Sequence, residues 1–469
     1  MTAPHGMPEQ APGRTAVVVG GGLAGVTAAL RLADAGVSVT LTEARPRLGG
    51  LAFSFKRGDL TVDNGQHVFL RCCTAYQWFL DRIDARDLVH LQDRLDVPVY
   101  DAANGRTGRL SRAGLPVPLH LAASLARYPH LSLRERASVG RAALALRGLD
   151  LADPALDEVD FGSWLAERGQ SARTIEALWD LVGVATLNAT AAHSSLALAA
   201  MVFKTGLLTE PGASDIGWAK APLGDLHDGR GRTALDKAGV VTMLRTRATA
   251  LRPAEGGGWQ VELETGPGRG AALPADTVVL AVPQREAHGL LPEGAVQHPE
   301  KLLQIGTAPI LNVHVIYDRK VLHEPFVAAL GSPVQWVFDR TESSGLTGGG
   351  QYVAVSQSAV EDEIDLPVAQ LRDRYLPELE RVLPDARGAA VREVFVTRER
   401  TATFAPTPGV GALRPGPVTR APGLYLAGAW TATGWPATME GAVRSGLHAS
   451  AEALSALGLP VDNGVLEAA

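Results

Sequence analysis

Residues 15–25 read TAVVVGGGLAG, and the pattern of this segment points to one class of fold. Thr15 to Val19 is a short apolar run, which is typical of a central strand in a parallel sheet. After the glycines, Val26 to Ala35 has apolar residues at helical spacing, and Val37 to Leu41 predicts a second strand. The order of strand, glycine turn, helix and strand predicts a βαβ unit of about 30 residues.

The glycines at 20, 22 and 25 have the G-x-G-x-x-G spacing of a dinucleotide-binding turn. Gly20 would make the tight turn, Gly22 would let the backbone approach a diphosphate, and Gly25 would let helix and strand pack closely. Glu43 ends the second strand 18 residues after Gly25, where its carboxylate would accept hydrogen bonds from ribose hydroxyls. These features predict a dinucleotide site, although NAD and FAD share them.

The composition excludes several classes of protein. The chain has 469 residues, enough for two domains, and its net charge of −6 does not favour nucleic-acid binding. Cys72 and Cys73 are adjacent, so they form neither a disulfide framework nor a metal site, and we expect no metal. Residues 1–13 lack a signal-peptide pattern, and no uninterrupted apolar run of about 18 residues predicts a membrane span. We therefore expect a cytoplasmic protein.

The nucleotide-binding domain is expected in three segments, because α/β patterns recur in the middle and near the end of the chain. In one of these later patterns, the end of a helix at Leu235 to Gly239 is followed by a strand predicted over Val240 to Leu251. The first of the two insertions is mainly helical, and its most apolar stretch, Leu181 to Phe203, predicts a buried helix. The nucleotide-binding segments are 14–98, 211–300 and 399–456, and the insertions, which would form the substrate domain, are 99–210 and 301–398.

The second insertion mixes strand and helix patterns. Its predicted strands are Ile310 to Tyr317, Val334 to Phe338 and Tyr352 to Gln357, and its predicted helix runs from Pro367 to Val382.

Residues 43–50, which we call the fingerprint segment, narrow the choice of dinucleotide. They read EARPRLGG and resemble the second FAD motif of the flavin amine oxidase and phytoene desaturase superfamily. The resemblance implies an α/β fold in which a Rossmann-like FAD-binding domain is interrupted by an inserted α+β substrate domain, as in amine oxidase-like two-domain flavoproteins. An arginine beside the FAD diphosphate is a sensible charge-assisted donor. The FAD contacts implied here are Arg45, Arg47, Gly49 and Gly50.

Residues 426–430 and 434–442 strengthen this resemblance, because they look like the superfamily's C-terminal FAD motif. The motif implies a helix start that points N–H groups at the flavin, where a positive helix end stabilises negative charge on the reduced ring. The superfamily usually has Asp after the motif's glycine, bonded to a ribityl hydroxyl, whereas this chain has Ala429. The implied contacts are Gly428, Thr438, Met439 and Glu440, with Ala248 on the adenine side.

A closer resemblance begins at residues 62–67, which read VDNGQH and which we call the VDNGQH turn. With GWPATME at 434–440, this turn is similar to the hydroxysqualene dehydroxylases, also called squalene-associated FAD-dependent desaturases. The family implies a long-chain isoprenoid substrate and reductive removal of its hydroxyl to give squalene, in squalene and hopanoid biosynthesis, with reduced FAD as hydride donor. It also implies that Gly65 and Gln66 contact FAD. The sequence leaves the electron donor unknown.

Departure of hydroxide needs an assisting group, and three side chains are candidates. His67 could act as a general acid near neutral pH, or it could be a structural histidine bonded to the flavin or to a backbone carbonyl. Asp63 could take the acid role, but an aspartate in a turn commonly caps the local backbone. Glu440 could also serve, although its place at a helix start favours a dipole or capping role.

Three other functions stay open. A carotenoid-type desaturase or isomerase would use the same fold on a similar polyene but run the flavin in the oxidative direction. An amine oxidase would need an aromatic cage and a flavin-side lysine, and Lys301 and Lys320, the only lysines after residue 237, lie in no recognisable version of that motif. In a non-catalytic alternative, Ala429 weakens FAD binding and the chain serves as a partner subunit or lipid carrier.

A lipid-soluble substrate suggests peripheral contact with the inner face of the cell membrane. Residues 115–149 carry five arginines and one acid, Glu135, which gives a net charge of +4. Basic residues beside apolar bulk could form an interfacial patch, or they could be the solvated charged face of an ordinary insertion helix, and the sequence leaves both open. The arginines are Arg127, Arg134, Arg136, Arg141 and Arg147, and the leucines are Leu119, Leu121, Leu125, Leu131 and Leu133.

Overall fold

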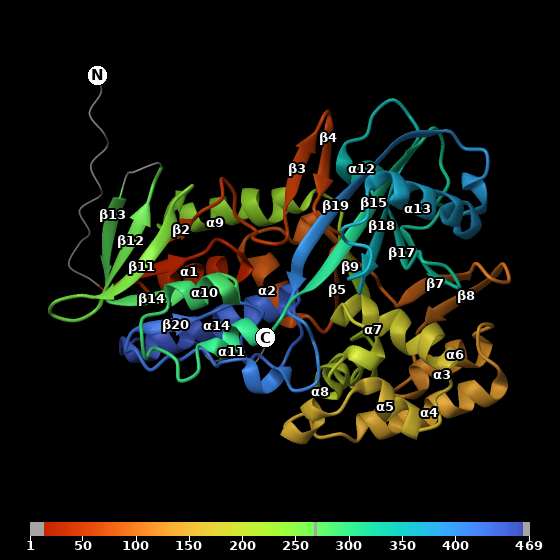
Figure 1. Cartoon of the computed structure of the whole chain (residues 1–469), viewed down its shortest axis with the longest axis horizontal. Helices are drawn as coiled ribbons and strands as arrows, with labels where there is room; N and C mark the ends of the chain where they lie inside the picture. The colour runs from red at the N-terminus through yellow and green to blue at the C-terminus, as the bar shows by residue number, and fades with distance from the viewer. Residues whose placement is uncertain (1–13, 267–269, 463–469) are drawn as a thin grey trace.

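The computed structural model describes residues 14–266 and 270–462, and Figure 1 shows how they are arranged. In this view the half with the glycine turn lies to the left, and the inserted sheet and helices lie to the right. Residues 1–13, in which the sequence shows no signal-peptide pattern, lie outside the described part of the chain.

The first sheet is parallel and has the strand order β10-β2-β1-β14-β20, so distant parts of the chain lie side by side. Helices α1 and α14 pack so closely that a Cβ on Gly446 would lie 2.9 Å from the Cβ of Thr27. The predicted α/β class with a Rossmann-like sheet is confirmed. The elements are β1 Thr15–Val19, α1 Leu23–Asp34, β2 Ser38–Glu43, β10 Val241–Leu244, β14 Thr277–Leu280, β20 Leu424–Leu426 and α14 Met439–Ala456.

Strands β11 (Arg247–Pro253), β12 (Trp259–Glu264) and β13 (Gly270–Ala275) form an antiparallel sheet at the left of Figure 1. The prediction of one strand over Val240 to Leu251 is wrong, because Arg245 has a left-handed backbone with φ of 54°. The turn at Arg245 ends β10 in the parallel sheet, and β11 then starts in the antiparallel one.

The largest sheet is mixed and has the order β19-β15-β18-β17-β16-β7-β8. The strands and the helix predicted in the second insertion are confirmed, with ends shifted by at most two residues. Strands β7 and β19 run across the expected boundaries at 98/99 and 398/399, and the division into domains stays a prediction. The bounds are β7 Asp96–Asp101, β8 Arg106–Ser111, β15 Ala308–Tyr317, β16 Phe326–Leu330, β17 Trp336–Asp339, β18 Gln351–Ser358, α13 Val368–Val382 and β19 Val391–Thr403.

The first insertion is helical after β8, and its helices gather at the lower right of Figure 1. The prediction of one helix over Leu181 to Phe203 is wrong, because Asn188 adopts a left-handed conformation with φ of 59° and ends α7. The Asn188 side chain donates to Thr403 Oγ1 and accepts from Ala359 N, so the break is anchored to β19. The bounds are α3 Leu119–Arg127, α4 Leu133–Arg147, α5 Phe161–Glu167, α6 Ala172–Thr174, α7 Asp180–Leu187 and α8 Leu196–Phe203.

Short elements connect these units. They are β3 Ser54–Arg57, β4 Leu60–Asp63, β5 Val68–Leu70, α2 Thr74–Arg82, β6 Val89–Leu91, β9 Ile216–Ala219, α9 Gly231–Lys237, α10 Gln284–Leu290, α11 Glu300–Gln304 and α12 Thr341–Ser344. Within residues 14–266 and 270–462, no helix has the length and hydropathy needed to cross a bilayer.

Candidate FAD site and active site

The glycine turn joins β1 to α1 with almost no room for side chains. A Cβ on Gly25 would overlap the carbonyl oxygen of Gly20, and Gly20 itself has φ of +109°, which favours glycine. A Cβ on Gly22, in contrast, would meet only Gly50 Cα at 3.7 Å. The turn therefore leaves the backbone at Gly22 open to a ligand.

The N-terminus of α1 is suited to a diphosphate. Gly22 is the N-cap, the first turn holds no acidic residue, and no side chain in the described part of the chain caps it. Its free N–H groups and the positive end of the helix dipole are therefore uncompensated by protein. This is the environment in which dinucleotide phosphates bind.

The carboxylate of Glu43 is held at the end of β2 beside the glycine turn. Its Oε2 accepts the N–H of Gly21 at 2.7 Å, and its Oε1 accepts the N–H of Arg45 at 2.7 Å. The Arg45 side chain itself is exposed. Thr246 N donates to the Glu43 carbonyl at 2.9 Å, which places the start of β11, with the buried Ala248, next to this end of the site.

The fingerprint segment is clamped onto the glycine turn. Gly49 N donates to Gly21 O at 2.9 Å, and both Gly49 and Gly50 have positive φ. The guanidinium of Arg47 donates to Gly50 O at 2.9 Å and lies 3.4 Å from the centre of the Phe53 ring. Burial lowers the Arg47 pKa, but the group stays a cation at the edge of the turn.

Sequence reasoning missed the residues that support the fingerprint segment from the stretch before α9. Asp228 accepts the N–H of Leu48 at 2.9 Å. Buried His227 bonds Ala52 O through Nδ1 at 3.0 Å and Tyr76 OH through Nε2 at 2.9 Å. Burial lowers the His227 pKa to about 4, so the ring is neutral at neutral pH. No local motif marks these residues in the sequence.

The C-terminal loop, residues 428–435, leads into α14. Thr438 is the N-cap of this helix, and its Oγ1 accepts the N–H of Gly441 at 3.1 Å. The N–H groups of Met439 and Glu440 lie in the first turn, where helix N–H groups have no partner within the helix. Gly428 has φ of +140° and donates its N–H to Ser445 Oγ at 2.8 Å.

Arg414 organises this loop and was also missed from the sequence. Its buried guanidinium donates to the carbonyls of Trp430 at 3.3 Å, Ala429 at 3.2 Å and Trp435 at 2.9 Å, and also to that of Thr431. Burial lowers the Arg414 pKa to about 10, which leaves the group charged at neutral pH. The loop backbone at Ala429 is therefore held although the side chain lacks the carboxylate usual in the superfamily.

Asp63 in the VDNGQH turn is fully engaged by protein. Its carboxylate accepts from Ser54 Oγ at 2.6 Å, from Leu223 N at 2.9 Å and from the Arg340 guanidinium at 2.5 Å. The residue is only 5% exposed. These contacts match a structural role for Asp63, and its catalytic role stays a prediction.

His67 lies half-buried at the end of the same turn, next to half-buried Gln66. Its Nδ1 is 3.1 Å from Gly65 O, and because a carbonyl only accepts, Nδ1 carries the proton. Burial lowers the His67 pKa, so the neutral ring presents an Nε2 lone pair. The acid role predicted for His67 therefore requires the imidazolium form.

Glu440 caps a different helix from the one that contains it. Its buried carboxylate accepts from the N–H groups of Tyr76 at 2.7 Å and Ala75 at 3.2 Å, at the start of α2, and from Arg444 Nε at 2.7 Å. Burial raises the Glu440 pKa. The capping expected of Glu440 thus joins α2 to α14, and its catalytic role stays a prediction.

Similarity to known proteins covers nearly the whole chain. A family model described as flavin containing amine oxidoreductase matches residues 23–454, so the chain belongs to that family and is an FAD-dependent oxidoreductase. The chain is 29% identical to the hydroxysqualene dehydroxylase of Sinorhizobium fredii, over 93% of this chain and 98% of that protein. It is 30% identical to the hydroxysqualene dehydroxylase of Rhodopseudomonas palustris, over 94% of this chain and 99% of that protein. The zeta-carotene desaturase of Synechocystis is 24% identical to this chain, over 92% of this chain and 96% of that protein.

Solved structures share the fold. An oxidoreductase from Methanosarcina mazei has a TM-score of 0.72 at 15% identity and covers 92% of this chain and 99% of its own. The cyclohexylamine oxidase from Brevibacterium oxydans has a TM-score of 0.68 at 19% identity, and the match covers 95% of this chain and 100% of that one. The predicted amine oxidase-like fold and the predicted FAD cofactor are confirmed.

Proposed function

We propose that this protein catalyses the reductive removal of the hydroxyl of hydroxysqualene to give squalene. The observation that carries this proposal is the similarity to two hydroxysqualene dehydroxylases over at least 93% of this chain and 98% of theirs. Because of this coverage, the similarity extends over the segments expected to form the substrate domain as well as over the glycine turn. The substrate is a long isoprenoid alcohol, and the reductant reaches the flavin from a donor outside this chain.

The residues around the glycine turn fit FAD and would hold it. The N-terminus of α1 would bind the diphosphate, and Glu43 would accept hydrogen bonds from the ribose hydroxyls. Arg47 would donate to a phosphate oxygen of the diphosphate. The start of α14 would lie at the flavin, where its N–H groups favour negative charge. Reduced FAD, when bound, supplies a hydride to the allylic carbon.

The balanced reaction joins one hydride and one proton to the substrate and releases water. The carbon–oxygen bond breaks, the carbon gains the hydride, and the hydroxyl oxygen gains the proton. We propose that protonated His67 donates that proton from Nε2, because Asp63 and Glu440 are already bonded to protein donors. The hydrogen bond from Nδ1 to Gly65 O would fix the ring orientation during the transfer.

A carotenoid-type desaturase is the second candidate, since the Synechocystis zeta-carotene desaturase also matches across the chain. That reaction removes hydrogen from a polyene and needs oxidised FAD, so the direction of flavin chemistry separates the two. The FAD-loaded protein should be reduced anaerobically and given hydroxysqualene, and in parallel be kept oxidised and given phytoene. Squalene formed only in the first reaction supports the proposal. A desaturated product in the second, with no squalene in the first, would overturn it.

A further inference from the structure

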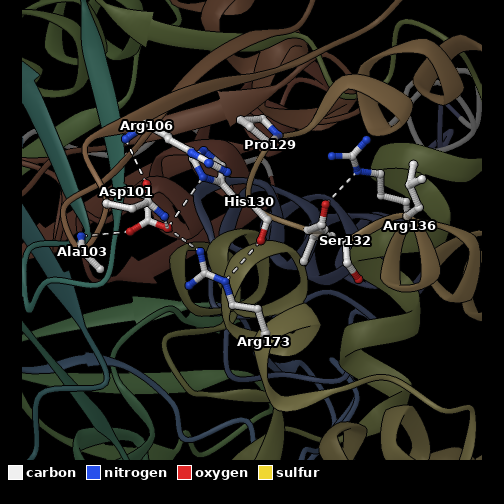
Figure 2. Close-up of a pocket in the computed structure, with 11 residues that line it drawn as sticks. Asp101, Ala103, Arg106, Pro129, His130, Ser132, Arg136 and Arg173 are labelled. Atoms are coloured by element: carbon white, nitrogen blue, oxygen red, sulfur yellow. Dashed lines mark hydrogen bonds and ion pairs between the residues drawn. The ribbon is translucent and has the colours of Figure 1, made fainter.

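A cationic surface pocket adjoins the N-terminus of α4 in the first insertion. It has a volume of about 550 Å³ and lies between the β7–β8 turn, the segment before α4 and α6. Figure 2 shows Asp101 on one side of it and Arg136 on the other, with His130 between them in this view. Its lining includes Asp101, Arg106, His130, Leu133, Arg136 and Arg173.

The residues that line the pocket carry more positive than negative charge, with three arginines and one aspartate. Asp101, the only acid among the described residues that line the pocket, is paired with Arg173, which also meets Glu176 at 3.1 Å. Arg106 and Arg136 form no ion pair with any residue in the described ranges, and Arg136 is held by donating to the carbonyls of Leu131 and Ala126. Two fixed or exposed arginines without counter-charges favour an anionic ligand.

His130 is a buried part of the pocket wall. The residue is 5% exposed, and its Nε2 donates to Val99 O at 3.2 Å. Its Nδ1 is buried without a hydrogen-bond partner among the described residues, and it lies 3.7 Å from the Asp101 carboxylate. Because burial lowers the His130 pKa, the ring is neutral and leaves this position of the pocket wall without a positive charge of its own.

Helix α4 extends from the pocket with an exposed apolar stripe. Leu133, which lines the pocket, is 79% exposed, and Leu144 is 58% exposed. With exposed Ala137 they share one helical face at spacings of four and seven residues. Exposed Arg134 and Arg141 lie along one side of the stripe, while the opposite face of α4 is buried. Apolar stripes edged by arginine are typical of helices that lie in a membrane interface.

Exposed apolar side chains concentrate in this part of the molecule. Six of the twelve large hydrophobic residues that are exposed in the described chain fall between residues 115 and 159: Leu115, Leu119, Leu133, Leu144, Leu151 and Val159. Of the five leucines in the interfacial patch predicted from the sequence, only Leu119 and Leu133 are exposed, and Leu131 is buried. The exposed stripe on α4 and the adjoining pocket are therefore the better-defined surface.

We propose that the α4 stripe and this pocket together bind the surface of an anionic phospholipid bilayer, with a headgroup phosphate beside Arg106 and Arg136. The exposed leucines of the stripe would enter the interface. Each arginine near an anionic surface adds about 1 kcal/mol, so losing one weakens partitioning about fivefold.

Vesicle flotation of the full FAD-loaded protein tests this surface. Vesicles of phosphatidylcholine with roughly 30% phosphatidylglycerol, which have a negative surface potential, should float the protein, and pure phosphatidylcholine should not. Arg106→Gln and Leu133→Ser should each weaken binding several-fold, and their effects on the free energy of binding should be additive in the double variant. Matched exposed changes elsewhere, Arg372→Gln and Leu303→Ser, should leave binding unchanged.

Two results would overturn the proposal. One is equal flotation of the wild type, Arg106→Gln and Leu133→Ser, which would place any lipid contact elsewhere. The other is saturable binding of inorganic phosphate that requires Arg106 without any flotation, which would make the pocket a site for a soluble anion. Turnover of detergent-dispersed hydroxysqualene should be the same in all variants, so failure of the proposed reaction is seen separately from failure of membrane binding.

Discussion

Asp63 and Arg340 form a buried ion pair between residues 277 positions apart, with 2.5 Å from Oδ2 to the guanidinium. The pair joins the VDNGQH turn to the end of β17. Arg340 also donates to Ala219 O, so the same side chain fixes β9. We therefore regard Asp63 as a positioning residue for the turn that ends in His67.

Replacing Asp63 by Asn should destabilise the protein. The change leaves the Arg340 cation buried without its carboxylate, which costs about 3 kcal/mol. The apparent free energy of unfolding in urea should fall by that order. A matched exposed change, Asp59→Asn, should have little effect. If Asp63→Asn kept its stability while turnover vanished, Asp63 would be the acid and this account of the turn would be wrong.

The buried His227 should make stability sensitive to acid. Its pKa is about 4 in the folded protein and near 6.5 when unfolded, so the unfolded chain binds the proton first as the pH falls. The stability contributed by neutral His227 is complete above about pH 6.5 and is lost as the pH falls toward 4.

The variant His227→Gln isolates this effect, because an amide can bond Ala52 O and Tyr76 OH but does not titrate. Other buried histidines contribute equally to both proteins, so the difference between their stability curves reports His227. Wild type should lose more free energy of unfolding than the variant between pH 6.5 and 4. Parallel curves would show that His227 does not hold the fingerprint segment as a neutral ring.

Arg414→Lys should weaken FAD binding. A lysine ammonium cannot donate to the carbonyls of Ala429, Trp430, Thr431 and Trp435 at once, and each buried carbonyl left unpaired costs about 1–3 kcal/mol. We expect the Kd for FAD to rise at least tenfold, measured by quenching of flavin fluorescence. The control is Arg420→Lys, a change at an exposed arginine that, like Arg414, precedes β20 in the chain. An unaltered Kd in Arg414→Lys would mean that the C-terminal loop does not depend on Arg414.

The amount that could be predicted from sequence depends on how local each signal is. Gly20, Gly22, Gly25 and Glu43 were found because one strand–turn–helix–strand unit contains them all. Arg340 and Arg414 were not found, because the segments that they bind, the VDNGQH turn and the C-terminal loop, come close to them only in the folded chain. The break at Arg245 was missed because it depends on a distant partner, the carbonyl of Arg45, and an arginine gives no local turn signal. The break at Asn188 did have a local signal, because asparagine commonly ends helices in the left-handed conformation, but the apolar run around it outweighed that signal.

The acid role proposed for His67 predicts a particular pH profile. Only the imidazolium can donate from Nε2, and burial lowers the His67 pKa below 6.5. The value of kcat/KM should therefore fall as the pH rises above that pKa, by about tenfold per unit. His67→Gln should remove this slope and lower the rate at acidic pH. The same slope in His67→Gln would assign the proton to another group.

The most direct test of the central claim follows the hydride. The protein should be loaded with FAD, reduced anaerobically in D₂O, mixed with hydroxysqualene for a single turnover, and its lipids analysed by mass spectrometry and NMR. Transfer from the reduced flavin predicts squalene with one deuterium, at the carbon that carried the hydroxyl. Recovery of hydroxysqualene unchanged, or of squalene without deuterium at that carbon, would contradict the proposed reaction.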